Sequence, residues 1–578
     1  MSRRTPWAAA ALLALAGACL TACVQVPSTG PVVQTEESVQ PSPNGNPDNN
    51  PPPPRPGMSP TQIVSGFLEA MTATPLQTST AQQFLTTAGR ALWQPRSVIA
   101  YNGLRPQPRG STTVQVGLHA ADLIGPAGRW LGRLGPAASR VSFPMQVENG
   151  EWRIAQAPDA LLVPVDFYDQ TFQDASLYFF DPSARLLVPE VVHVPQGQQL
   201  TTSLMQALVQ GPQRSLEGVV RTFLPPGLTA SPVVVSNGVA DVTLNGRDPG
   251  QLSQRTTRLI VAQLAWTLRQ DPSVNALTLS IAGRQITDPT GSSTFQVDSP
   301  EVARYDPAKP TASSQLYALR RGELVSGQSN RLTPVGGPFG TSDLGIGAFA
   351  VSLDDNTVAA TTRTSLLVGP VRGAVNPTRV LTGTGVLRPA WAFSGRLWAV
   401  QDQPGGAVVL SFARHREREV RLSGISGEDV RLFIVSRDGS RLVAVIRGPQ
   451  RDRLVLSRIR YDQDGQVVSG TPARDLRWAT GSSTRIRDVG WTSPTTLAVL
   501  DQASSAQAEV RLLAVDGSTN PAETPPIVVP GRVLSLATTP SGDAPPFAVQ
   551  PGRLFDLSQV DTTDLLPVPG LRFITYVG

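Results

Sequence analysis

Cysteine is almost absent from this chain of 578 residues, which contains only Cys19 and Cys23. Both lie within the first 23 residues, so the rest of the chain can form no disulfide and can offer no thiolate ligand to a metal. A nucleophilic pair of cysteine and histidine is excluded for the same reason. The protein must therefore depend on ordinary apolar cores, and its length is sufficient for three or four domains.

Histidine is scarce as well, and its three copies do not form a recognisable site. No two of them have the spacing of metal ligands, and the sequence contains no Gly-x-Ser-x-Gly motif. His119 ends an alternating stretch, His193 lies within a predicted strand, and His415 lies in a segment of mixed charge. We interpret each as a packed or surface imidazole. We therefore expect no enzymatic activity, no metal and no cofactor.

Two adjacent carboxylates, Asp354 and Asp355, are the most evident acidic candidates. They lie in a predicted turn, where aspartate commonly accepts hydrogen bonds from nearby backbone amides. A glycosidase needs two carboxylates brought together in one cleft, and the sequence nominates no such pair.

The positive charge is carried almost entirely by arginine, because Lys309 is the only lysine. We interpret this bias as a sign of a GC-rich genome. The formal net charge is +5, and it falls to +3 when Arg3 and Arg4 are removed. Such a small excess does not indicate a nucleic-acid partner, and we expect none.

The first 22 residues have the pattern of a secretory signal peptide. Arg3 and Arg4 precede an apolar run over residues 7–20, and small residues follow it. This run is too short and wrongly flanked for a stable membrane span.

The end of that segment, Leu20-Thr21-Ala22-Cys23, resembles a bacterial lipobox. In a lipobox the cysteine thiol receives a diacylglyceryl group, and the signal is cut just before the cysteine. Cleavage is thus predicted between Ala22 and Cys23, and Cys23 is the predicted lipidation site. Cys19 is a weaker acceptor, and an ordinary secreted protein with a chance cysteine is the alternative. The expected location is the outer face of the cytoplasmic membrane, with the lipid on Cys23 in the bilayer.

Residues 23–57 are rich in proline, asparagine, serine, glutamine and glycine. Such a segment cannot bury enough apolar surface to order itself, so we predict a disordered tether. In the polyproline conformation it could extend over about 100 Å.

Residues 58–164 are predicted to form a small α+β domain. A helix begins at Ser59-Pro60 and places Ile63, Phe67 and Met71 on one face. A shorter helix is expected near residues 81–85. Alternating strands over 112–119, 139–147 and 151–155, the last two joined by Asn149-Gly150, indicate one curved antiparallel sheet.

Residues 165–305 carry the clearest pattern and are predicted to form a second α+β domain. Strands are expected over 175–180, 186–194 and 275–281, helices over 200–210 and 253–270, and a hairpin at Asn237-Gly238. The segment resembles the GerMN domain of spore-germination proteins. The resemblance is carried by residues 176–180, Gly211-Pro212, 224–227, 239–242 and 274–283.

From residue 311 to residue 578 short strands dominate, and an all-β propeller is predicted. An apolar strand, a turn of serine, aspartate and glycine, and a second apolar strand recur five times. The copies begin near Ala350, Trp391, Phe433, Val489 and Leu536. Their spacing of roughly 40 to 55 residues is within the range of propeller blades. Five or six blades would fill the segment; a pair of β-sandwiches is the alternative.

This combination of lipobox, tether, small α+β domain, GerMN-like domain and propeller resembles the actinobacterial LpqB lipoprotein family. The resemblance implies an extracytoplasmic accessory protein that binds the sensor kinase MtrB. It would thereby modulate the MtrA–MtrB pair, which governs cell-wall metabolism and division. The expected partners are thus the external domain of a membrane sensor kinase and the lipid bilayer. The alternative is a protein that associates with peptidoglycan and acts on cell-wall enzymes.

Overall fold

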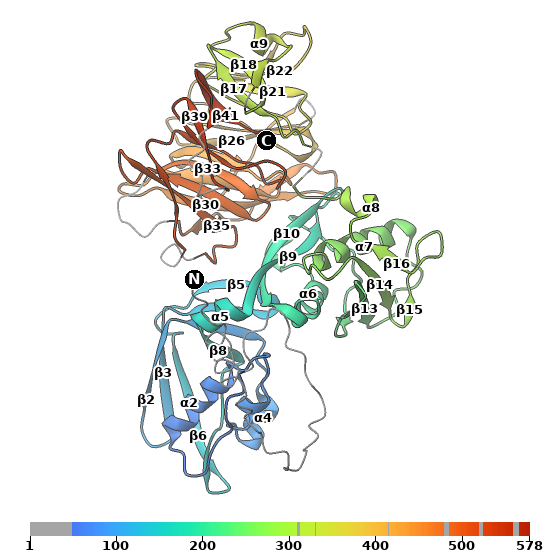
Figure 1. Ribbon diagram of the computed structural model, residues 1–578, viewed down its shortest axis with the longest axis vertical. Helices are drawn as coiled ribbons and strands as arrows, with labels where there is room; N and C mark the ends of the chain where they lie inside the picture. Colours follow the sequence, from blue (N-terminus) through green and yellow to red (C-terminus); the bar gives the residue numbers. More distant parts are fainter. Residues whose placement is uncertain are drawn as a thin grey trace, which may run out of the picture. The chain divides into compact units, whose positions relative to one another are not determined.

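The computed structural model describes residues 49–308, 312–329, 331–413, 416–478, 485–519, 524–558 and 566–578. The predicted signal peptide, the lipobox cysteine, most of the predicted tether and His415 lie outside these residues. Three successive domains of the described chain can be followed by colour in Figure 1, from blue through green to red.

The first domain opens with helix α2 (Pro60–Ala70), as predicted. Ser59 caps the helix, because its hydroxyl accepts a hydrogen bond from the Gln62 amide while the Gln62 side chain accepts one from the Ser59 amide. Ile63 and Phe67 are fully buried against the sheets. The second predicted helix corresponds to α3 (Ser79–Gln82), and a further short helix that was not predicted, α4 (Thr87–Leu92), follows it.

The sheet prediction for this domain is wrong in topology. Two four-stranded sheets are present, with strand orders β5-β4-β1-β8 and β2-β3-β6-β7. The strands are β1 (Ser97–Tyr101), β2 (Gly103–Pro108), β3 (Thr113–His119), β4 (Asp122–Ile124), β5 (Trp130–Arg133), β6 (Arg140–Glu148), β7 (Glu151–Ile154) and β8 (Ala160–Pro164). The predicted β3 and the β6–β7 hairpin at Asn149-Gly150 are confirmed. However, β8 pairs with β1 in parallel. The two strands are far apart in the sequence, so no local pattern predicts this pairing.

Residues 49–57, at the end of the predicted tether, are ordered against the first domain. Asn49 and Thr74 exchange two backbone hydrogen bonds, at 3.2 and 2.9 Å, and Pro51 is buried. The amide of Gly57 donates to a carboxylate oxygen of Glu151 at 2.9 Å. Residues 49–57 therefore belong to the first domain. Their own composition favours disorder, but the first domain provides hydrogen-bond partners that order them.

The second domain contains the elements expected of a GerMN-like fold. A long hairpin of β9 (Phe172–Phe180) and β10 (Leu187–Pro195) follows helix α5 (Val165–Thr171). A six-stranded sheet has β13 and β14 in parallel at its centre. The other elements are α6 (Leu200–Val209), β11 (Thr229–Ala230), β12 (Val234–Ser236), β13 (Val239–Asn245), α7 (Gln254–Leu268), β14 (Ala276–Ile281), β15 (Arg284–Gln285), β16 (Thr294–Gln296), α8 (Pro300–Ala303) and the 3-10 turns η2 (Gly197–Gln199) and η3 (Arg214–Leu216).

Helix α7 makes the crossover between the two parallel strands and packs one face inward. Leu259, Ala262 and Trp266 are buried, and so is Gln263. The Gln263 side chain exchanges hydrogen bonds with the hydroxyl of Thr222, which satisfies its amide inside the core. The helix begins at Ser253, whose hydroxyl accepts a hydrogen bond from the Thr256 amide at 3.1 Å.

Replacing Ser253 with alanine is expected to lower the free energy of unfolding by about 1 kcal/mol, because the Thr256 amide loses its acceptor. Urea denaturation of the full-length chain followed by circular dichroism measures this change. Ser215→Ala is the control. Ser215 is exposed, and its hydroxyl donates to the Gln213 side chain, so its loss should cost less than about 0.5 kcal/mol. Equal losses in both variants would contradict the capping role.

The third domain is a propeller of six sheets among the described residues. The strands are β17 (Leu316–Arg320), β18 (Glu323–Gln328), β19 (Arg331–Pro334), β20 (Ala348–Val351), β21 (Thr357–Thr361), β22 (Ser365–Pro370), β23 (Thr378–Thr382), β24 (Ala390–Ala392), β25 (Arg396–Gln401), β26 (Val408–Ala413), β27 (Arg416–Glu419), β28 (Val430–Val435), β29 (Arg441–Ile446), β30 (Arg453–Tyr461), β31 (Val467–Gly470), β32 (Arg474–Leu476), β33 (Ile486–Ser493), β34 (Thr496–Asp501), β35 (Gln507–Ala514), β36 (Ile527–Pro530), β37 (Ser535–Ala537), β38 (Phe547–Gln550), β39 (Arg553–Asp556), β40 (Leu566–Pro567) and β41 (Leu571–Thr575). A short helix, α9 (Pro338–Thr341), lies between β19 and β20.

The five repeats seen in the sequence form the first two strands of five blades, from β20–β21 to β37–β38. The sixth blade has a different origin. In it the last strand, β41, pairs antiparallel with β17, so the red end of the chain lies beside the yellow-green start of the propeller in Figure 1. The first strands of successive blades contact one another all the way round, from β20 to β41 and back to β20. Pairing of β41 with β17 thus closes the ring.

Candidate functional site

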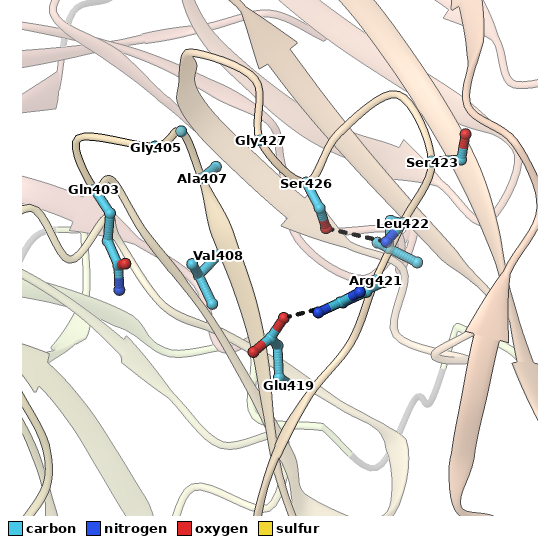
Figure 2. Close-up of a pocket in the computed structure, with 11 residues that line it drawn as sticks. Gln403, Gly405, Ala407, Val408, Glu419, Arg421, Leu422, Ser423, Ser426 and Gly427 are labelled. Atoms are coloured by element: carbon cyan, nitrogen blue, oxygen red, sulfur yellow. Dashed lines mark hydrogen bonds and ion pairs between the residues drawn. The ribbon is translucent and has the colours of Figure 1, made fainter.

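A cavity of about 570 Å³ opens beside strands β26 and β27 of one propeller blade. Figure 2 shows that Glu419 and Arg421 lie side by side at its edge, with an ion pair of 3.5 Å between Oε1 and Nε. Their side chains are 55% and 90% exposed, so this pair contributes little to stability. On the other side the hydroxyl of Ser426 accepts a hydrogen bond from the Leu422 amide at 3.0 Å.

Much of the wall of this cavity is backbone from a glycine-rich turn. Gly406 has a φ of 95°, and a Cβ atom at this position would collide with the backbone of Gly427. The turn can therefore approach its neighbour only with glycine at this position. The lining offers backbone groups, the side chains of Gln403, Ser423 and Ser426, and one exposed ion pair, which suits hydrogen bonding to a polar ligand. Among the described residues, neither serine hydroxyl forms a hydrogen bond to a basic side chain, as an activated nucleophile would.

A second candidate site surrounds His193 on β10. The Nδ1 atom lies 2.8 Å from Oδ1 of Asp174, which is the directly opposite residue on β9. The Nε2 atom lies 2.9 Å from Oδ2 of Asp516, in the turn after β35. The imidazole is buried, with 6% of the residue exposed. Because both ring nitrogens are occupied by carboxylates, neither is free to bind a metal or to accept a proton from a substrate.

Burial by itself would lower the pKa of His193. Hydrogen bonds and charge from Asp174 and Asp516 outweigh that effect and raise the pKa to about 9. Burial similarly favours the neutral form of Asp516, but the hydrogen bond and charge of His193 lower the pKa of this carboxyl. At neutral pH the site therefore contains an imidazolium held between two carboxylates.

A network of buried charges lies on the same strand, around Glu190. One carboxylate oxygen is 2.5 Å from Nη2 of Arg458, and the other is 3.5 Å from Nη2 of Arg441. Arg441 is fully buried; its Nη1 lies 3.1 Å from Asp438, and its Nη2 donates to the carbonyl of Pro189. Burial, reinforced by the charge of Arg458, lowers the pKa of Arg441 to about 10, and the attraction of Asp438 and Glu190 opposes this. The guanidinium therefore remains charged at neutral pH.

These two clusters connect the β9–β10 hairpin of the GerMN-like domain to the propeller. The loop before β5 of the first domain approaches the same strand. Gly128 has a φ of 72°, and a Cβ atom there would overlap the carbonyl of His193. Strand β10 thus carries both the close backbone contact with Gly128 of the first domain and the buried ion pairs with the propeller. The arrangement is suited to holding domains together, since its charged groups bind one another.

The other residues singled out in the sequence lie apart from these clusters. His119 is exposed at the end of β3. Asp354 accepts hydrogen bonds from the Ser352 hydroxyl at 2.6 Å and from Asn356, as expected for a turn aspartate. Asp355 forms an ion pair with Arg372 at 3.0 Å. Ala22, Cys23 and His415 lie outside the described residues. In the described part of the chain, no group of three or more histidine, cysteine, aspartate or glutamate residues is placed to hold a metal.

The residues that matter most to these clusters, Glu190, Arg441 and Asp516, were not identified from the sequence. A signal did exist, because Glu190 interrupts an otherwise apolar strand that also contains His193. A charge in a buried strand requires a partner. The pattern could not say which of many charged residues, hundreds of positions away, would provide it.

In the described ranges, we find no helix with the length and apolarity needed to cross a membrane.

Three family models match successive parts of the chain. Residues 53–168 match the N-terminal domain of lipoprotein LpqB, residues 176–287 match a sporulation and spore germination domain, and residues 322–540 match the LpqB β-propeller domain.

Curated relatives align along most of the chain. Lipoprotein LpqB of Thermobifida fusca is 27% identical, covering 88% of this chain and 90% of the relative. Lipoprotein LpqB of Cutibacterium acnes is 26% identical, covering 89% of each. Among solved structures, the first GerMN domain of the sporulation protein GerM from Bacillus subtilis is 20% identical. That match has a TM-score of 0.17 and covers 22% of this chain and 97% of the other.

Proposed function

The chain belongs to the LpqB lipoprotein family, and on this premise we propose that it is a lipid-anchored extracytoplasmic accessory protein. Its proposed role is to bind and modulate a membrane sensor kinase of the MtrB kind, and so to influence cell-wall metabolism and division. This kinase role is what the family resemblance implies.

The single observation that carries the anchoring part of this proposal is the lipobox ending at Cys23. A diacylglyceryl group brings two acyl chains, and two chains anchor a protein far more firmly than one. Three domains tethered in this way have a raised effective concentration near any membrane partner. The propeller and the GerMN-like domain supply binding surface, which agrees with a role in recognition.

Cys23→Ala is expected to move the protein from the membrane fraction to the soluble fraction, because the thiol that takes the lipid is gone. Cys19→Ala is the matched control and should remain in the membrane fraction. Fractionation of cells followed by immunoblotting measures both. An unchanged thermal unfolding curve for Cys23→Ala shows that the fold is intact. Retention in the membrane fraction of Cys23→Ala from which the signal segment has been removed would overturn the anchor assignment.

The partner is tested with the full-length protein in detergent. Under our proposal, it co-purifies with the sensor kinase from membrane extracts, and Cys23→Ala reduces kinase signalling in cells. The matched assay is sedimentation with purified peptidoglycan. Sedimentation with peptidoglycan in the absence of kinase capture would favour the alternative, a cell-wall binding protein.

A further inference from the structure

A smaller cavity, of about 210 Å³, lies between the first domain, the GerMN-like domain and the propeller. Arg129, just before β5, and Trp130, its first residue, form one wall. Strand β10 and turn η3 provide a second wall, and β30 with the residues around β32 provide the third. Ligand sites occur preferentially at such domain junctions. This cavity is distinct from the one in Figure 2.

The wall carries more positive charge than its carboxylates can neutralise. Glu190 already binds Arg458 at 2.5 Å, and Asp516 already binds His193 at 2.9 Å. Both carboxylates on the wall are therefore already paired with a cation. Three arginines share this wall: Arg129, Arg458 and Arg474.

Two of these arginines are held by neutral carbonyl groups. Arg129 Nη2 donates to the Gly211 carbonyl at 2.8 Å, and Arg474 Nη1 donates to the Asp516 carbonyl at 2.8 Å. Among the described residues neither forms an ion pair with a carboxylate. Burial lowers the pKa of Arg129, and the nearby charge of Glu190 only partly opposes this. Positive charge thus remains uncompensated at the junction.

Two buried donors on wall residues also lack an acceptor. They are Nη1 of Arg458 and Nε1 of Trp130, which have no hydrogen-bond partner among the described residues. Buried donors normally find a partner, and an unpaired one calls for an explanation. Both donors are closed to solvent, so what a ligand carrying several anionic oxygens would provide is the missing negative charge.

We propose that this cavity binds the phosphate group of a small phosphate ester. The guanidinium fork matches phosphate oxygens, which accept two parallel hydrogen bonds from one arginine. The volume is that of about seven water molecules at ~30 Å³ each, enough for a phosphate and a short polyol such as glycerol. Val191 and Leu456 on the wall can contact the carbon skeleton of the ester. The ligand bridges three domains.

Calorimetric titration of the full-length protein in detergent tests the proposal, with glycerol 3-phosphate as the probe and glycerol as the neutral control. Saturable binding of the ester without binding of glycerol is expected. A phospholipid headgroup carries the same phosphate, so a short-chain phosphatidylglycerol below its micelle concentration is titrated in parallel. Tighter binding of one or the other assigns the source of the phosphate, and either result supports the phosphate site.

Three variants give the test its specificity. Arg474→Gln and Ser215→Asp should each weaken ester binding about tenfold, the first by removing a cation and the second by adding an anion to the wall. Arg453→Gln is the control, because Arg453 is half-exposed, is paired with Asp475 at 2.9 Å and lies off the cavity wall. Ser215 is exposed, so Ser215→Asp keeps its fold even if Arg474→Gln does not. No saturable binding of either ester at millimolar concentration, or equal affinity in wild type and Ser215→Asp, would overturn the proposal.

Discussion

Arg441→Leu is expected to lower the free energy of unfolding of the propeller by about 3–5 kcal/mol. The guanidinium is completely buried, and its removal leaves Asp438 without its cation while Glu190 loses one of two. Breaking one side of a buried charge network costs more than the network contributes, because the remaining charges stay out of water. Differential scanning calorimetry of the full-length chain should show a fall of roughly 10 °C in the propeller transition.

The matched control is Arg431→Leu, on the neighbouring strand β28. Arg431 forms an ion pair with Asp429 at 2.8 Å, but the two side chains are 47% and 44% exposed. Exposed pairs contribute about 0–1 kcal/mol, so the transition should move little. A double-mutant cycle with Glu190→Gln then isolates the coupling across the domain boundary. Similar losses for Arg441→Leu and Arg431→Leu would show that burial of the network does not determine its contribution.

The second large effect is a loss of folding free energy at alkaline pH, caused by deprotonation of His193. Its pKa rises from the ordinary 6.5 to about 9 on folding, so its contribution is complete below pH 6.5 and is lost as the pH rises through 9. A shift of this size corresponds to about 3 kcal/mol. Asp174 and Asp516 face the ring from two sides, and the Tyr168 ring lies 6.4 Å away. Burial raises the pKa of Tyr168, so this phenol stays neutral throughout the range.

His193→Gln should remove this pH dependence between 6.5 and 9 and should destabilise the protein most at the lower end of that range. His119→Gln is the control, since His119 is exposed and should leave the curve unchanged. Urea unfolding measured at several pH values gives the free energies. At acid pH Asp516 has the opposite effect. Its pKa is lowered in the folded protein, so the stability that its ionised carboxylate contributes is lost as the pH falls below 3.8. A wild-type curve that is flat from pH 6.5 to 9 would contradict the imidazolium assignment.

Local structure was accessible from the sequence where a segment carries its own signal. Helix α7 has a capping serine and an apolar face, and the β12–β13 hairpin has Asn237-Gly238 at its turn. The periodicity of the propeller likewise revealed five of the six blades. The sixth stayed hidden because β17 and β41 come from opposite ends of the domain, so no repeat unit contains both.

The charged clusters were inaccessible for a related reason. His193 and Asp516 are 323 residues apart, and Glu190 and Arg458 are 268 residues apart. Each of these residues is one of many charged residues in the sequence. Which two of them pair is determined only by the folded structure. The parallel pairing of β1 with β8 was missed in the same way, because parallel strands lack the turn that marks a hairpin.

Strand β41 ends three residues before the last residue of the chain, and even those residues are engaged. The amide of Gly578 donates to Val351 at 2.9 Å, and the carbonyl of Val577 accepts from Arg437 at 3.3 Å. Because synthesis proceeds from the N-terminus, β17 is among the first propeller strands to be made, whereas its partner β41 is made last. During this interval it is an open edge, the kind of surface that pairs with other chains. Some 250 residues are synthesised between β17 and β41, so the risk of misassembly is greatest at the start of the propeller.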